Sequence, residues 1–276
     1  MSDELEPGLY IVATPIGNLS DLSPRAAATL AAADLIAVED SRVTAKLLNH
    51  IGAKRPMKPY HDHSDESVRR DLVGRMATQA VALVSDAGTP LISDPGYKLV
   101  RDARAAGVPV FTIPGPSAVI SALTLAGLPT DRFAFFGFLP AKPGARGTAL
   151  AEAATFNGSL VFYESGPRLA GALAAMADGL GDRPAAVVRE ISKRFEETVT
   201  GSLSELAARY AQAAPKGEIV VVVGPPAEAA PIGEADVDEA LREAMSRLSP
   251  SRAAAEVAAK LGLPRRTVYE RAQALK

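Results

Sequence analysis

The chain has 276 residues, with 30 basic and 32 acidic side chains and a formal net charge of −2, and it is long enough for two domains. This balance excludes a strong overall attraction to nucleic acid but leaves a local basic patch open. The absence of cysteine excludes disulfides, zinc thiolate sites and thiol catalysis, and it is typical of a reducing compartment. The sequence has no signal-peptide pattern and no apolar run of membrane-spanning length, so we expect a soluble, cytoplasmic protein without a membrane partner.

The first half of the chain alternates short apolar runs with stretches of helical spacing. These runs predict buried strands at residues 9–14, 34–38, 57–60, 80–84 and 108–112. Strands that alternate with helices at this rate are typical of a parallel sheet covered on both faces. We expect the apolar run FAFFGF, residues 133–138, to end this lobe, which gives a first domain over residues 1–139.

A second α/β lobe is predicted over residues 140–226, after a Pro- and Gly-containing linker at 139–144. Helices are expected near residues 168–180 and 203–213. Strands are predicted at 159–163, 185–189, 197–200 and 218–223. The strand at 197–200 follows its predecessor without a helix between them, which indicates a mixed sheet.

The remaining residues, 232–276, are predicted to form a helical domain after a Pro/Ala linker at 225–231. A helix at 251–260, a tight Leu-Gly-Leu-Pro turn and a helix at 265–275 have the helix-turn-helix layout. The second helix carries basic side chains that suit RNA phosphates: Arg265, Arg266, Arg271 and Lys276. The alternative is a small helical cap that packs on the second lobe.

The segment SDAGTPLISDPG, residues 85–96, lies between a predicted buried strand and a predicted helix. In parallel sheets, such loops lie at the carboxyl edge, where ligands bind. Two glycines give the backbone unusual freedom, two prolines stiffen it, and Asp86 and Asp94 add charge. We interpret the loop as a ligand cradle; a tight turn with solvated acids is the alternative.

Several segments together resemble one family. They are TPIGNLSDLSPRA, AVEDSRVTAKLL, SDAGTPLISDPG, IPGPSAVISAL, FFGFLP, FYES, REISKRFEE and KGEIVVVVG, in order from residue 9 to about 225. Their combination is similar to the ribosomal RNA small subunit methyltransferase I family, of the tetrapyrrole-methylase-like superfamily, and the helical tail also fits that family. Eight motifs in the right order are far more specific than any single one.

The resemblance implies a two-lobed tetrapyrrole methylase-like α/β fold, a homodimer, and S-adenosylmethionine in the cleft between the lobes. It implies 2′-O-methylation of a cytidine in the decoding region of 16S ribosomal RNA, with the assembled 30S subunit as the expected partner and no metal. Carried over by motif, the expected cofactor contacts are Pro15, Ile16, Gly88, Thr89, Ile92, Ser117, Ala118, Leu139, Tyr163, Arg189, Gly217 and Glu218.

Two departures from the family pattern affect the expected site. Ser41 replaces the usual Thr after Glu-Asp, which keeps the hydroxyl group. FYES is followed by Gly166, Pro167 and Arg168 instead of Pro-His-Arg, so any role of that histidine is lost. The second departure argues against a catalytic role for the FYES segment.

Transfer of a methyl group to a ribose hydroxyl calls for a general base. The candidate catalytic residues, at or near the carboxyl ends of first-lobe strands, are Glu39, Asp40, Arg42, His61 and Asp86, with His63 beside them. Asp40 and Arg42 have an ion pair or helix cap as their alternative, and each histidine a solvated loop position. Lys193 and Arg194 are predicted to contact RNA phosphate, or else to form a solvated charged face.

Two other functions remain possible at this point. One is methylation of a small tetrapyrrole or corrinoid precursor, and the helical tail and the length of the loop at 85–96 argue against it. The other is a non-catalytic nucleic-acid-binding protein, which has no need of a stiff loop system at the ends of its strands.

Overall fold

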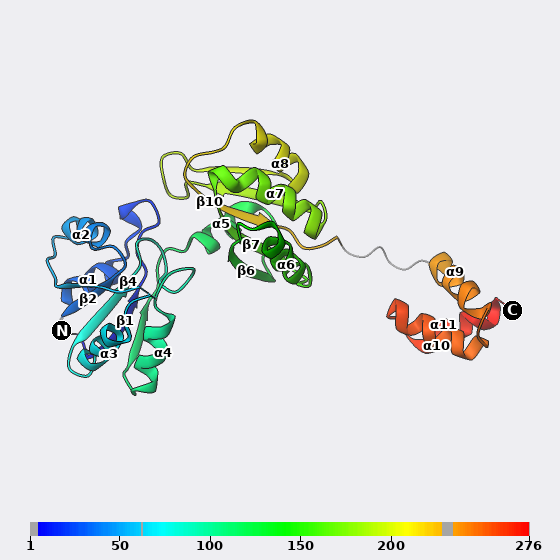
Figure 1. The fold of residues 1–276 in the computed structure, drawn as a ribbon, viewed down its shortest axis with the longest axis horizontal. Helices are drawn as coiled ribbons and strands as arrows, with labels where there is room; N and C mark the ends of the chain where they lie inside the picture. The colour runs from blue at the N-terminus through cyan, green and yellow to red at the C-terminus, as the bar shows by residue number, and fades with distance from the viewer. Residues whose placement is uncertain (1–4, 62, 228–233, 276) are drawn as a thin grey trace. The chain divides into compact units, whose positions relative to one another are not determined.

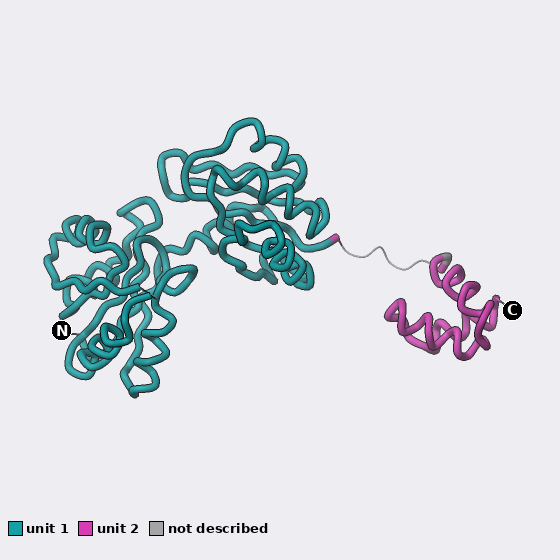
Figure 2. The backbone as a smooth tube through the Cα atoms, in the orientation of Figure 1, with its two compact units in different colours: residues 1–226 teal, residues 227–276 magenta. Residues whose placement is uncertain are grey.

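The computed structural model describes residues 5–61, 63–227 and 234–275 (Figure 1). The chain divides into two compact units, residues 1–226 and 227–276 (Figure 2). No helix in the described part of the chain combines the length and the apolar character that a bilayer crossing needs. The two units are described in turn.

The first unit begins with a five-stranded sheet in the order β3-β2-β4-β1-β5, and every pair of neighbours is parallel. Its strands are β1 (Gly8–Val12), β2 (Leu35–Val38), β3 (Met57–Pro59), β4 (Ala80–Val84) and β5 (Val110–Ile113). The predicted parallel sheet is confirmed, and each strand boundary lies within two residues of its predicted place. Parallel strands bring their carboxyl ends, and the loops that follow, to one edge of the sheet.

Four helices cover the two faces of this sheet, α1 (Pro24–Ala32), α2 (Ser41–His50), α3 (Glu66–Arg75) and α4 (Tyr97–Ala105). Alternate residues along a strand point to opposite faces, so Ile36 and Val38 pack with α1 and α2. Their neighbours Leu35 and Ala37 pack with α3 and α4. Burial on both faces explains why these strands have no polar alternation in the sequence.

The second sheet, in the same unit, has the order β6-β7-β10-β8-β9. Its strands are β6 (Phe133–Phe138), β7 (Ser159–Ser165), β8 (Pro184–Arg189), β9 (Glu197–Ser202) and β10 (Glu218–Val223). Only β6 and β7 are parallel, and all other pairs are antiparallel. The predicted mixed sheet is confirmed.

The prediction that residues 133–138 end the first lobe is wrong. The segment is β6, and it pairs with β7 in the second sheet, with Phe133 opposite Ser159. The helix before it, α5 (Ala118–Ala126), also packs on strands of the second sheet. An apolar run records that a strand is buried but not which sheet it joins, so the sequence could not place this one.

Three further helices cover the other face of the second sheet, α6 (Pro143–Ala154), α7 (Gly166–Leu180) and α8 (Leu203–Gln212). Helix α6 was not predicted, because the linker predicted at 139–144 overlaps its start. Pro143 is the first helical residue, a position where the missing amide hydrogen costs nothing. On the opposite face, Val119, Ala122 and Leu123 of α5 pack against the sheet.

The second unit contains α9 (Glu234–Met245), α10 (Pro250–Leu261) and α11 (Arg265–Ala274), which share a small apolar core around Leu241 and Val268. The turn after α10 uses Gly262 in the left-handed conformation, at φ 65°. The predicted helix-turn-helix layout is confirmed. Lys276, the boundary at residue 232 and residues 228–231 of the predicted linker lie outside the described residues.

Candidate active site

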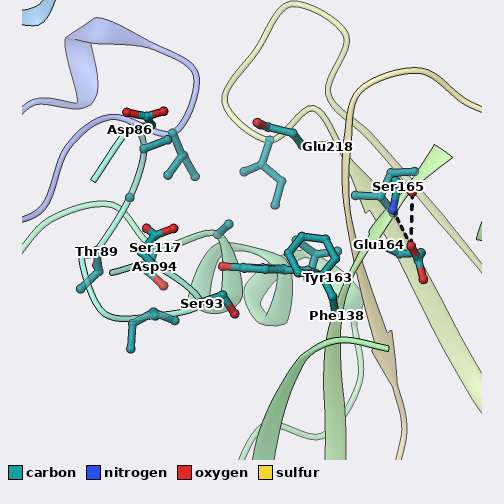
Figure 3. A pocket seen from close by; sticks show the side chains of 18 of the residues that line it. Asp86, Thr89, Ser93, Asp94, Ser117, Phe138, Tyr163, Glu164, Ser165 and Glu218 are labelled. Carbon is teal, nitrogen blue, oxygen red and sulfur yellow. Dashed lines mark hydrogen bonds between the residues drawn. The ribbon is translucent and has the colours of Figure 1, made fainter. Parts of the chain in front are cut away.

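A cavity of about 420 Å³ lies where loops of the two sheets meet (Figure 3). We call it the first cavity. Its size falls in the range of small-molecule sites, about 300–1,000 Å³. Nine of the twelve residues predicted to bind the cofactor line it: Ile16, Gly88, Thr89, Ile92, Ser117, Ala118, Tyr163, Gly217 and Glu218.

The loop at 85–96 is held in place by its own backbone. Thr14 and Gly88 exchange two hydrogen bonds, with N···O distances of 2.9 and 3.1 Å. Gly88 has φ 81°, and a Cβ atom there would stand 3.3 Å from Cγ2 of Ile16. The conformation favours glycine, and the close approach leaves little room for a side chain.

Backbone strain is concentrated around the first cavity. In the described ranges, four non-glycine residues have positive φ: Leu91 (75°), Ser93 (63°), Glu190 (50°) and Ser192 (65°). The first pair belongs to the loop at 85–96 and the second pair to the turn between β8 and β9. Such conformations cost on the order of 1–3 kcal/mol each and are typical of functional sites.

Three carboxylates from the first sheet form one wall of the first cavity: Glu39, Asp86 and Asp94. They converge because β2 and β4 are neighbours and both end at this edge. Burial, then the charges of Asp94 and Asp86, raise the pKa of Glu39. Burial likewise raises the pKa of Asp94, with a smaller contribution from Asp86. The wall is therefore suited to a ligand with positive charge.

The start of α5 forms the floor between the two lobes. Ser117 is the N-cap residue of α5, and its side chain makes no cap hydrogen bond. Thr89 fixes the preceding segment by donating its hydroxyl to the carbonyl of Pro116 at 3.0 Å. Because the first-turn amides of a helix have no carbonyl partner within it, this end favours an anionic group.

Aromatic side chains form the wall from the second sheet. Tyr163 makes edge-on contacts with Phe135 and Phe138, with ring centroids 4.8 and 5.5 Å apart. Phe138 lines the first cavity and is 56% exposed. Burial, followed by the charges of Asp94 and Glu218, raises the pKa of Tyr163 to about 12, so its hydroxyl stays protonated near neutral pH. This wall suits a flat apolar group.

Glu164 and Ser165 of the FYES segment also line the first cavity, and they have a structural role. Glu164 lies on the side of its strand away from Tyr163 (Figure 3), and its Oε1 accepts a hydrogen bond from the Ser165 amide at 2.8 Å. The guanidinium of Arg168 bridges Glu164 and the carbonyl of Leu139. These contacts tie the start of α7 to the end of β6.

The turn between β8 and β9, residues 190–196, is held by side chains. The Lys193 ammonium lies 3.1 Å from Oε1 of Glu190 and 2.8 Å from Oε2 of Glu218. The Ser192 hydroxyl donates to the Asp21 carboxylate of η1 (Leu19–Asp21), a short helix of the first lobe. Arg194 and Phe195 at the tip are exposed, with the guanidinium carbon 5.6 Å from the ring centroid.

Three predicted cofactor contacts do not line the first cavity. Pro15 lines a second, smaller cavity. Leu139 is 3% exposed and belongs to the core of the second sheet. Arg189 is directed to Glu197, with Nε 2.5 Å from Oε2. Phe138, the neighbour of Leu139, lines the first cavity.

Of the predicted catalytic residues, Glu39 and Asp86 line the first cavity, whereas Asp40, Arg42 and His61 do not. Asp40 caps α2 through the Arg42 amide at 2.8 Å and pairs with the Arg42 guanidinium. The Arg42 hydrogen bonds hold the pKa of Asp40 at about 2. His61 is exposed, with its ring 6.3 Å from that of His63.

The predicted RNA contacts outside the turn lie on α11. Arg265 is exposed, and Arg266 pairs with Glu270 across one helical turn at 3.0 Å. Arg271 is turned inward to Asp238, at 2.6 Å. In the described residues, no group of three or more His, Asp or Glu side chains forms a candidate metal site.

Several residues that line the first cavity were not predicted as site residues: Ala87, Ser93, Asp94, Phe138, Glu164, Ser165, Ile191, Ile219 and Val220. Asp94 carried a signal, since it lies in the loop that the sequence marked as a cradle. An irregularity in β6 between Phe135 and Phe138, with Gly137 at φ 62°, brings Phe138 to the same side as Phe135, against Tyr163. Nothing local marked Ile191, Ile219 and Val220, which read as ordinary core residues.

Comparisons with known proteins agree with this geometry. The model of the Tetrapyrrole (Corrin/Porphyrin) Methylases matches residues 8–207, and that of the RsmI C-terminal HTH domain matches residues 231–276. A protein of Mesorhizobium japonicum, "Ribosomal RNA small subunit methyltransferase I", is 50% identical over 99% of this chain and 93% of its own length. A protein of the same name in Erythrobacter litoralis is 53% identical over 100% of this chain and 98% of its own.

Solved structures share the fold at low identity. Diphthine synthase has a TM-score of 0.62 at 16% identity and covers 79% of this chain and 89% of its own. Uroporphyrin-III C-methyl transferase from Thermus thermophilus, complexed with S-adenyl homocysteine, has a TM-score of 0.54 at 23% identity, covering 79% and 97%. The chain therefore belongs to the tetrapyrrole methylase family, and within it to the ribosomal RNA small subunit methyltransferase I proteins.

Proposed function

We propose that the protein uses S-adenosylmethionine to methylate the 2′-oxygen of a cytidine ribose in the decoding region of 16S ribosomal RNA. One observation carries the proposal. The first cavity, with a carboxylate wall and an aromatic wall, lies in a chain that is 50% and 53% identical, over at least 99% of its length, to two proteins named "Ribosomal RNA small subunit methyltransferase I".

The residues of the first cavity fit the cofactor. S-adenosylmethionine carries a sulfonium and an ammonium group, which suit the wall of Glu39, Asp86 and Asp94. Its carboxylate suits the amides at the start of α5. Its adenine suits the ring of Tyr163, and the bare Gly88 leaves room for close approach of the ligand.

The cofactor supplies an activated methyl group, so the protein chiefly positions the reactants and accepts a proton. When bound, S-adenosylmethionine would supply the methyl carbon to the ribose 2′-oxygen, and its sulfur would keep the electron pair of the broken carbon–sulfur bond. The hydroxyl proton passes to a carboxylate and then to water. Glu39 and Asp86 line the first cavity and can accept this proton. Asp40 is a poor proton acceptor, because its hydrogen bonds with Arg42 hold its pKa at about 2.

We assign RNA binding to Arg265 and Arg266 of the second unit and to Arg194 at the tip of the turn at 190–196. Arg194 and Arg265 are exposed, and the exposed Arg266–Glu270 pair is weak enough to be exchanged for phosphate. The assembled 30S subunit as substrate, a homodimer and a cytoplasmic location complete the proposal.

The decisive experiment supplies tritiated S-adenosylmethionine with small ribosomal subunits, with naked 16S RNA, or with a tetrapyrrole precursor, all from cells that lack the enzyme. We expect label in one cytidine of the small subunit, resistant to alkaline cleavage on its 3′ side. Label in the tetrapyrrole alone, or none in RNA despite cofactor binding, would reject the proposal.

Deletion of residues 227–276 tests the role of the second unit. The deleted unit has its own core, so we expect the remaining protein to bind the cofactor normally and to bind RNA more weakly. Unchanged RNA affinity, with a matched thermal transition for residues 1–226, would exclude that role.

A further inference from the structure

A second cavity, of about 240 Å³, lies wholly within the first lobe. It is formed by the loop after β1, by α2 and by the end of β4. Its floor is buried and includes Thr14, Thr44 and Ser85, which are at most 4% exposed. A buried floor of this kind gives the cavity a fixed shape.

The rim of the second cavity combines apolar and basic groups. Leu19 is 45% exposed and Val43 is 38% exposed, which leaves two large apolar side chains facing water. Lys46 stands one helical turn beyond Val43, and within the described ranges no ion pair engages it. Apolar side chains with a nearby cation suit the base and the phosphate of a nucleotide.

Asp86 lines both cavities. The loop after β1 separates them, because Ile16 faces the first cavity while Pro15 and Gly17 face the second. The Asp40 amide fixes the Asp86 carboxylate by donating to Oδ1 at 3.0 Å. A ligand in either cavity therefore meets the same oriented carboxylate.

We propose that the second cavity receives the nucleoside to be methylated, unstacked from the RNA, with its base between Leu19 and Val43 and its phosphate at Lys46. This inference rests on the proposed function. An in-line transfer requires the acceptor to enter from a site that adjoins the cofactor, and the shared carboxylate marks that junction. Asp86 lies at this junction, beside the path of the methyl group, and takes the hydroxyl proton, which leaves for water after the transfer.

The size of the second cavity also distinguishes substrate classes. A single nucleoside matches a space of this order, whereas a tetrapyrrole macrocycle is far larger and flat. Unpaired RNA offers its bases for insertion at little cost, since no base pair has to be broken. The cavity thus favours an accessible nucleotide of folded RNA as acceptor.

The first test fills the second cavity with Val43→Trp. We expect kcat/KM for the small subunit to fall about 100-fold, because a misplaced acceptor loses the in-line geometry. Calorimetry should show cofactor affinity unchanged. The matched control is Leu125→Trp, which enlarges an apolar side chain that is 39% exposed on α5 and lines neither cavity.

The second test is Lys46→Met, which keeps the length of the side chain. We expect weaker binding of a short single-stranded RNA that contains the target cytidine, and a salt slope reduced by about 1. Normal methylation by Val43→Trp, or an unchanged salt slope in Lys46→Met, would overturn the inference. If the unsubstituted protein fails to label small subunits, the proposed function fails instead, and the two results are distinguishable.

Discussion

The loop at 85–96 and the turn at 190–196 use the same backbone device but are held by different forces. Each has two non-glycine residues in the left-handed region. The first is fixed by the backbone hydrogen bonds between Thr14 and Gly88, and the second by the ion pairs of Lys193. One gathers side chains inward around a cavity, whereas the other presents Arg194 and Phe195 to solvent.

This difference separates two structural tasks: the loop at 85–96 keeps the shape of a cavity, and the turn at 190–196 presents side chains to solvent. Backbone hydrogen bonds do not depend on pH or salt, so they suit a cradle of constant shape. Ion pairs weaken with salt, and the exposed arginine beside them can exchange its partners. The following variants test this division.

The largest effect is expected from Gly88→Val. The new side chain would project toward Ile16 in a strained conformation, and we expect cofactor affinity to fall more than about 100-fold. Gly107→Val is the matched control, because Gly107 also has positive φ, at 72°, but nothing lies within 4 Å of its Cβ position. If calorimetry shows the same loss of cofactor affinity in both variants, the effect of Gly88→Val comes from backbone strain and not from filling the cavity.

Gly17→Ala should push the turn at 190–196 away from the first lobe. A Cβ atom at Gly17 would stand 2.5 Å from Cγ of Lys193 and 2.9 Å from the carbonyl of Ile191. Overpacking of this kind costs about 1–3 kcal/mol of unfolding free energy. Thermal unfolding compared with the unsubstituted protein measures this cost. A thermal transition no lower than that of the unsubstituted protein would show that the neighbouring side chains move aside easily.

Lys193→Met and Arg194→Ala distinguish an internal lysine from an RNA-facing arginine. Lys193 is bonded to two carboxylates, so its loss should lower the unfolding free energy by about 1 kcal/mol. Arg194 is exposed, so its loss should reduce the salt slope of RNA binding by about 1 and leave stability unchanged. The opposite pattern in the two variants would return Lys193 to the RNA surface, as the sequence predicts.

The smallest expected effect is the release of protons when the cofactor binds. Burial raises the pKa of Asp94 in the first loop. Burial also acts to raise the pKa of Glu190, in the turn at 190–196. Hydrogen bonds from Lys193 and the Glu218 amide outweigh burial there, so the pKa of Glu190 lies below its usual value. A cationic cofactor favours ionised carboxylates, so its binding should release protons from Glu39 and Asp94 in mildly acid solution.

Affinity for the cofactor should therefore rise with pH through the raised pKa values of these two carboxyl groups. Calorimetry in two buffers of different ionisation enthalpy counts the protons released. S-adenosylhomocysteine, which lacks the sulfonium charge, is the matched control and should release fewer. Equal proton release by both ligands would place the sulfonium away from the carboxylate wall.

Local patterns predicted most of the fold. Apolar runs located nearly every strand, and the family motifs, confirmed by the comparisons, marked the loops at the ends of the strands. The errors were non-local. The run FAFFGF revealed a strand but not its partner, and α6 was hidden behind a segment that looked like a linker.

The site was predicted where one loop supplies several residues, as at Gly88, Thr89 and Ile92. The contacts across the molecule were missed. Lys193 and Glu218 are 25 residues apart, so the sequence does not show that they form an ion pair. An error of one residue, Leu139 for Phe138, was enough to exchange a core side chain for one in the cavity.

The central position of β10 has a consequence for the order of folding. It is the last strand of its sheet in the sequence, yet β7 and β8 are joined only through it. Contacts across such long stretches of chain form slowly, and they must wait for synthesis of residue 223. Gly217 and Glu218 arrive with this strand, so a growing chain possesses its acidic wall long before it can retain a cofactor.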